Sequence, residues 1–91
     1  MTKKTAVPVL TRPDAGTQRM KVLKTIARAG KRGLTDAETA SRLGMIESSI
    51  RHRRHELVED GWVVDSGKKR VFDDRRESTV WTLTEVGRSQ L

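Results

Sequence analysis

Apolar residues near the start of the chain recur with the spacing of a helix. Between Thr17 and Ala29 they fall on one face when the segment is placed on a helix of about 3.6 residues per turn. Thr17 is a suitable N-cap and Gly30 a suitable helix end. We therefore expect a first helix over Thr17–Ala29 and a loop over Gly30–Gly33. The apolar face of this helix consists of Val22, Leu23, Ile26 and Ala27.

Two more helical patterns follow, with only a few residues between them. Thr35 and Glu38 have the spacing of a capping box, in which each side chain satisfies a backbone N–H of the first turn. This predicts a second helix from about Asp36 to Leu43, which Gly44 would end in a left-handed conformation. A third helix is expected from about Glu47 to Asp60. The inward positions are Ala37, Ala40 and Leu43 in the second helix, and Ile50, Leu57 and Val58 in the third.

The last third of the chain changes to the pattern of strands. Trp62–Val64 and Thr79–Leu83 are rich in β-branched and aromatic residues and predict two strands. Between them, Ser66–Arg70 is typical of a basic turn. Thr84 is placed to cap a short final helix over Glu85–Gln90. The sequence therefore predicts an α+β domain made of three helices, a β-hairpin and a short C-terminal helix.

The length of 91 residues favours one domain. Residues 1–16 contain Pro8 and Pro13 and show no helical periodicity, so we expect a flexible basic tail there and the folded domain over residues 17–91. The tail is either a solvated segment or an arm that contacts a DNA backbone.

Charge and composition narrow the class of function. The net charge is +7, divided into +8 over residues 1–33, −3 over 34–65 and +2 over 66–91. Basic chains of this size often bind nucleic acid, because cations that neutralise phosphates release counterions. The absence of cysteine excludes disulfides, cysteine-ligated zinc and thiol nucleophiles. Without a long apolar run or the apolar centre of a signal peptide, the chain is expected to be cytoplasmic.

The ordered segments resemble a known family. Residues Gly33–Ala40, then Leu43 and Gly44, then Ser48–Ile50, then Glu56–Val63 resemble winged helix-turn-helix regulators, and are most similar to MarR-type cores and small bacteriophage winged-helix proteins. The resemblance implies sequence-specific binding of double-stranded DNA, with the third helix in the major groove, in transcriptional control. It leaves a homodimer on a repeated site open. Excision or replication control are alternative roles.

On the third helix, Ile50, Arg54 and Leu57 share the inward face. We expect Arg54 to bury its stem and to pair with a carboxylate. The outward face then becomes the candidate DNA-reading surface, with Arg51 suited to guanine and the serines suited to phosphate. The alternative for this face is a solvated charged surface. Its candidate DNA-binding residues are Ser48, Ser49, Arg51, His52 and His55.

The hairpin is the second candidate contact. Its cations could reach a phosphate backbone or a minor groove, and the alternative is a solvated loop that protects a strand edge. Residues 74–76 resemble the wing element of MarR-type proteins, although they lie one residue too far from Leu83. The candidate hairpin residues are Lys68, Lys69, Arg70, Arg75 and Arg76.

Other functions are less well supported by the pattern. His52 and His55 lack an evident third metal ligand, and no glycine-rich phosphate loop occurs, so we expect no enzyme, metal or cofactor. Trp62 and Trp81 are expected to pack in the hairpin rather than to stack on unpaired bases. The main alternative is a protein-interaction module, because the segment that contains the third helix has a net charge of −3.

Overall fold

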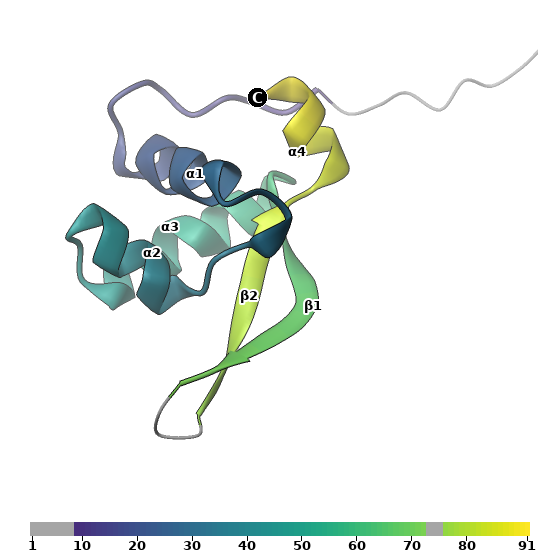
Figure 1. Ribbon diagram of the computed structural model, residues 1–91. Helices are drawn as coiled ribbons and strands as arrows, with labels where there is room; N and C mark the ends of the chain where they lie inside the picture. The colour runs from purple at the N-terminus through teal and green to yellow at the C-terminus, as the bar shows by residue number, and fades with distance from the viewer. Residues whose placement is uncertain (1–8, 73–75) are drawn as a thin grey trace, which may run out of the picture.

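A computed structural model describes residues 9–72 and 76–91 (Figure 1). The three long helices come first, the two strands form one antiparallel hairpin, and a short helix ends the chain. This confirms the expected α+β class and the order of its elements. The loop expected over Gly30–Gly33 is instead a single 3-10 turn. The elements are α1 Gln18–Arg28, η1 Gly30–Arg32, α2 Asp36–Leu43, α3 Glu47–Glu59, β1 Val63–Val71, β2 Glu77–Leu83 and α4 Glu85–Gln90.

Threonine caps set the start of three helices. Thr17, Thr35 and Thr84 each accept a hydrogen bond from the backbone N–H three residues on, at the N-termini of α1, α2 and α4. At α2 the full capping box is present, because the side chain of Glu38 also accepts from the N–H of Thr35. The predicted start of α2 is thereby confirmed. Helix α3 differs, since Ile46 occupies its N-cap and makes no side-chain hydrogen bond there.

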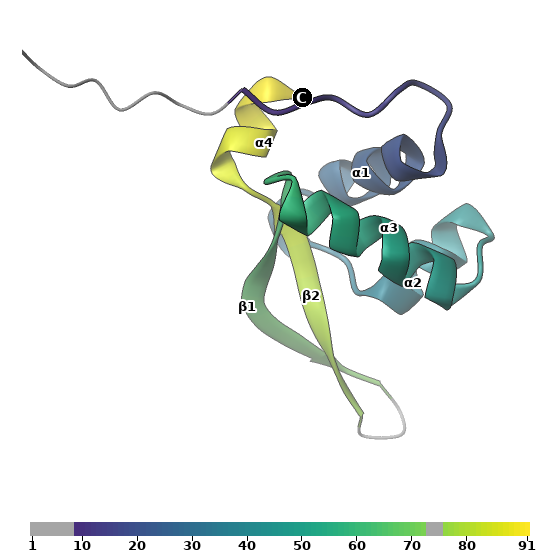
Figure 2. The same ribbon diagram turned by 180° about the vertical axis from the view of Figure 1, so that it is seen from behind.

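The core lies where α1, α3 and the base of the hairpin meet. Figure 2 shows α3 below α1 and beside the base of the hairpin. Trp62 is almost fully buried in this core, and its indole N–H donates to the carbonyl of Thr11 over 3.0 Å. A buried tryptophan needs such an acceptor, so its packing role is confirmed. The other core residues include Met20, Val22, Leu23, Ile26, Ile50, Leu57, Val63 and Leu83.

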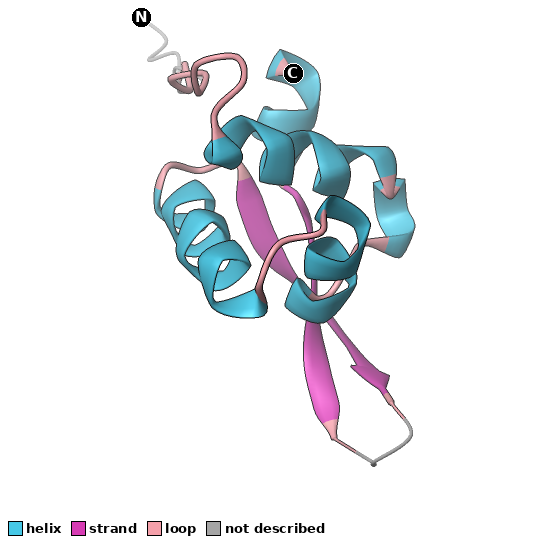
Figure 3. Ribbon diagram, turned by 90° about the vertical axis from the view of Figure 1, so that its left-hand side faces the viewer, coloured by secondary structure: helices cyan, strands magenta, loops and turns pink. Residues whose placement is uncertain are grey.

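The hairpin is longer than the sequence predicted. The turn expected over Ser66–Arg70 is wrong, because β1 runs through this segment with an irregular register between Asp65 and Lys69. At the irregularity the Gly67 N–H donates to the Asp65 carboxylate over 2.8 Å. Figure 3 shows the hairpin extending beyond the helices. Its outer half does not pack on the core, so no alternation of apolar and polar residues in the sequence predicts these parts of the strands.

A third short extended segment joins the hairpin. Leu34, an isolated apolar residue in the sequence, exchanges two backbone hydrogen bonds with Trp81, at 3.0 and 2.8 Å. Gly33 before it has φ of +69°, and a Cβ at this position would lie 2.6 Å from a side-chain carbon of Val80. Only glycine fits this backbone and this close approach without strain. The segment ties the link between α1 and α2 to β2.

Part of the expected tail lies on the domain. The Leu10 N–H donates to the side chain of Gln90 over 2.9 Å, and the Leu10 side chain packs against the core. Within residues 9–16, Leu10 and Thr11 therefore have hydrogen-bond partners in α4 and at Trp62. Residues 1–8 lie outside the described residues. Within the described ranges, no helix is both long and apolar enough to cross a membrane.

Candidate nucleic-acid interface

Helices α2 and α3 are joined by a tight turn. Gly44 adopts the left-handed conformation (φ 67°, ψ 31°), and the N–H groups of Gly44 and Met45 both donate to the carbonyl of Ala40. These bonds satisfy the end of α2 and reverse the chain within three residues, Gly44–Ile46. The two helices therefore pack closely, and α3 begins directly after the turn.

The expected outward face of α3 is exposed. Ser48, Arg51, His52 and His55 are exposed and Ser49 is half-buried, whereas Ile50 and Leu57 are buried. The structure thus brings the predicted residues of this helix onto one surface; it does not test what they bind.

Acidic neighbours on the same helix accompany this face. Arg51 pairs with Glu47 (3.4 Å), and His55 lies 3.3 Å from Glu59. The side chains of all four residues are at least half exposed. Pairs of this kind contribute at most about 1 kcal/mol, so they leave Arg51 and His55 able to exchange partners.

Arg54 fixes the hairpin against α3. Its guanidinium donates to both carboxylate oxygens of Asp36, at 3.0 and 2.7 Å, and its Cζ lies 3.9 Å from the centroid of the Trp81 ring. The two charged side chains are only 13% and 14% exposed. The expected carboxylate pairing of Arg54 is confirmed, and it joins α2, α3 and β2 at one point. The contact is one of the ties that hold the hairpin against α3.

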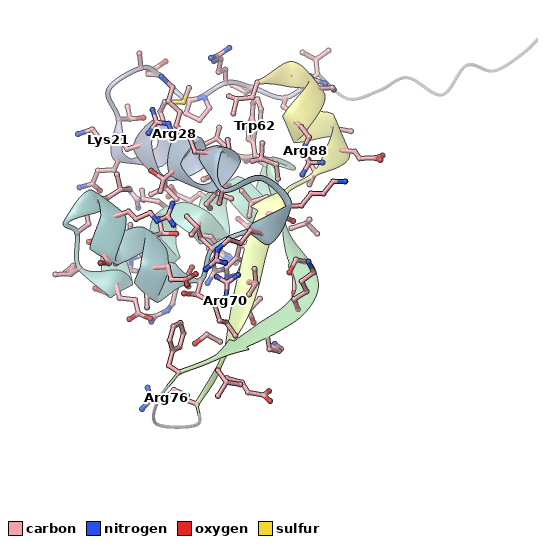
Figure 4. All side chains as sticks on the ribbon, in the orientation of Figure 1. Lys21, Arg28, Trp62, Arg70, Arg76 and Arg88 are labelled. Atoms are coloured by element: carbon pink, nitrogen blue, oxygen red, sulfur yellow. The ribbon has the colours of Figure 1, made fainter. Side chains whose placement is uncertain are left out.

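Arg70 makes a second tie between the hairpin and the helices. Its guanidinium pairs with Glu38 and donates to the carbonyl of Arg32 over 3.0 Å. Figure 4 shows Arg70 between the helices and the hairpin, far from the position of Arg76 near the hairpin end. The turn prediction had put Arg70 at an exposed tip. It lies in β1 instead, with partners within the domain.

The remaining hairpin candidates lie farther out. Lys68 and Lys69 are exposed on β1, and the Lys69 ammonium donates to the Thr79 hydroxyl over 3.0 Å. Arg76 is exposed at the start of the return strand, where its carbonyl accepts from the Phe72 N–H. Arg75 lies outside the described residues.

The start of α3 and the middle of β2 border the same small hollow, of about 150 Å³. This volume is below the range of about 300–1,000 Å³ that is typical of small-molecule sites. Within residues 9–72 and 76–91, His, Asp and Glu form no group of three or more that could hold a metal ion. The lining residues are Asp36, Ala37, Glu47, Arg54, Ser78, Thr79 and Trp81.

A strongly basic segment of the chain contains none of the residues predicted to bind DNA. Residues 17–33 contain six Lys or Arg and no Asp or Glu. On α1 the side chains of Lys21, Lys24 and Arg28 are exposed. Figure 4 shows Lys21 and Arg28 on the side of α1 turned away from α2 and the hairpin. These cations are spaced so that they lie opposite the apolar face of α1, and this spacing is the sequence signal that could have predicted a basic surface on the helix.

No protein-family model, curated protein or solved structure matches the chain.

Proposed function

We propose that the chain is a winged helix-turn-helix domain that binds double-stranded DNA with sequence preference. The observation that carries the proposal is the exposed face of α3, which follows a three-residue turn and is held beside the hairpin by Arg54 and Asp36. A helix presented in this way fits the major groove, and the hairpin beside it would follow the backbone or the minor groove. A role in transcriptional control, as the resemblance to MarR-type and bacteriophage proteins implies, is part of the proposal.

The roles of the side chains follow from their chemistry. Arg51 can pair with guanine in the major groove, and His52 can donate to a base or a phosphate. Ser48 and Ser49 lie in the first turn of α3, where the helix dipole favours phosphate. Lys68 and Lys69 would contact phosphates and add affinity without sequence preference.

Fluorescence anisotropy tests the proposal, first with random duplexes and then with the tightest duplex selected from them. The Arg51→Ala variant should lose about 5- to 150-fold of the preference for the selected duplex, because one bidentate contact to guanine is worth about 1–3 kcal/mol. The Lys69→Ala variant should weaken binding to all duplexes alike and reduce the salt slope by about one. Arg88→Ala, which removes an exposed cation from α4, is the control.

Two results would reject the docking. If the wild type binds duplexes and neither Arg51→Ala nor Lys69→Ala changes the affinity, α3 and the hairpin do not hold the DNA. If the wild type binds no duplex even at low salt, DNA binding itself is excluded.

The charge of α3 favours a second candidate, a protein-interaction module. The helix carries three arginines and three glutamates, so its formal charge is zero when the histidines are neutral. Readers of DNA usually concentrate positive charge at this place. Recovery of one host protein by the purified chain, combined with no affinity for duplexes, would support this candidate.

A further inference from the structure

The exposed side of α1 carries one line of positive charge. Lys21, Lys24 and Arg28 are spaced three and four residues apart, so they lie on one side of the helix. The buried side of α1, with Val22, Leu23 and Ile26, is on the opposite side. We call these three cations the α1 stripe. Like charges at this spacing repel each other and lower helix stability by a small amount.

None of the three cations of the α1 stripe has an acidic partner within the described residues, whereas the cations that face other elements of the domain do. Within residues 9–72 and 76–91, the ion pairs involve Arg19, three arginines and one histidine of α3, and Arg70. None involves the α1 stripe, although α1 supplies Arg19 to Glu56 and Asp60 on its other side. Acidic residues therefore compensate charge where elements meet and along α3, and they leave the outer side of α1 uncompensated.

We expect the α1 stripe to lie out of reach of a straight duplex that is seated on the exposed face of α3. The buried residues of α1 and Arg19 face the core and α3, and the stripe lies on the opposite side of α1. Packed helices have axes about 8–10 Å apart, and each helix is about 10–12 Å across. In Figure 4, Lys21 and Arg28 lie at the opposite end of the domain from Arg76.

We propose that the α1 stripe is a second polyanion-binding surface that takes the phosphate backbone of a separate duplex segment. From Lys21 to Arg28 the helix advances about 10 Å, which corresponds to the rise of about three base pairs along the axis of a duplex. Three flexible cations over this length match a backbone without reading its sequence. The surface would let one molecule hold two DNA segments.

The absence of apolar groups on this face favours nucleic acid over an acidic protein. Protein interfaces depend on a few buried aromatic or large apolar residues. Within the described ranges, the exposed large hydrophobic residues are Val9, Ile46, Val64, Val71 and Phe72, and none belongs to α1. A surface of cations alone fits a phosphate backbone better.

A capture experiment with the full chain tests the proposal. One duplex is fixed to beads, protein is added, and retention of a second, fluorescent duplex is measured at several salt concentrations. The test variant carries Lys21→Gln, Lys24→Gln and Arg28→Gln, which keep good helix formers in α1. The control carries Arg12→Gln, Arg42→Gln and Arg88→Gln, which remove the same charge from exposed positions elsewhere.

We expect the wild type and the control to retain the second duplex, and the test variant to retain at least about tenfold less, since it loses about three phosphate contacts. Its affinity for a single duplex should change much less. The proposal is overturned if the test variant retains the second duplex as well as the wild type does. That result is expected if a dimer bridges the two duplexes through the α3 helices of its two protomers. Equal losses in the test variant and the control would overturn it too, by assigning capture to net charge.

The same data separate this inference from the proposed function, on which the two-duplex arrangement rests. A wild type that binds one duplex but captures no second one leaves the α3 proposal standing and rejects the α1 stripe. If the test variant loses all duplex binding while Arg51→Ala loses none, the α1 stripe stands and the docking of α3 fails. If the wild type binds no duplex, both fail.

Discussion

Replacement of Arg54 by alanine should be among the most destabilising single changes on α3. The substitution removes two hydrogen bonds to Asp36 and the contact with the Trp81 ring. It also leaves the Asp36 carboxylate, which is 14% exposed, without its partner. The contact joins three elements, so its loss removes one of the ties between the hairpin and α3.

The magnitude follows from the two contacts. Hydrogen bonds to charged groups contribute about 1.5–3 kcal/mol, and a cation over an aromatic ring adds about 0.5–2 kcal/mol depending on desolvation. Breaking a fully buried ion pair costs about 3–5 kcal/mol, which is an upper bound for a pair that retains some exposure. We therefore expect Arg54→Ala to lower the free energy of unfolding by about 3 kcal/mol. For a domain of this size, that corresponds to a fall in Tm of roughly 12–24 °C.

Urea and thermal unfolding, followed by circular dichroism, measure this loss. Arg53→Ala is the matched control, because Arg53 lies next to Arg54 on α3 and pairs with Glu56 at 3.1 Å but is 33% exposed. It should cost at most about 1 kcal/mol. Asp36→Asn completes a double-mutant cycle with Arg54→Ala. Additive effects in the cycle, or equal losses for Arg53→Ala and Arg54→Ala, would refute the assigned role of the contact.

Two further predictions concern backbone positions. Ile46→Ser should stabilise the protein by about 1 kcal/mol, because it supplies the side-chain cap that α3 lacks. Thermal unfolding of Ile46→Ser and of Ile46→Ala checks this prediction, and equal stability of the two variants would contradict it. Gly33→Ala should destabilise by about 3–4 kcal/mol, because its Cβ would lie within 2.8 Å of three atoms of β2 at a φ of +69°. Gly30 has a similar φ of +59°, but a Cβ there would have no atom within 4 Å. Gly30→Ala should therefore cost only about 1–2 kcal/mol when both variants are unfolded in urea. Equal losses of stability at the two glycines would show that the close approach at Gly33 is unimportant.

The helices were predictable because their signals are local. Thr35, Glu38 and Gly44 define α2 through bonds that span no more than five residues, and the structure contains each of them. The inward side of α3 was also predictable, since Ile50, Arg54 and Leu57 fall on one side of any helix. The assignment of the inward side left the outer residues of α3 as candidates for binding DNA from the sequence alone.

The hairpin and the N-terminal segment were not predictable to the same extent, because their contacts are not local. β1 continues through Lys68 and Lys69 only because β2 pairs with it, and neither strand has an apolar side beyond the core. The partners of Arg70 are Glu38 and the carbonyl of Arg32, more than 30 residues away in the sequence. The attachment of Thr11 depends on Trp62, 51 residues later.

Charge summed along the sequence is a poor measure of the charge of a surface in this domain. The value of −3 for residues 34–65 includes Asp36, Glu38 and Glu56, each of which pairs with an arginine of another element. These three carboxylates are compensated by arginines of other elements, so the summed charge of −3 does not describe the exposed face of α3. It is therefore a weak argument against binding of DNA by this face. Part of the positive excess lies on the outer side of α1, where Lys21, Lys24 and Arg28 have no acidic partner within the described residues. If both proposals hold, sequence preference should depend on α3 and salt-dependent attraction largely on α1, and variants of the two surfaces should affect these properties separately.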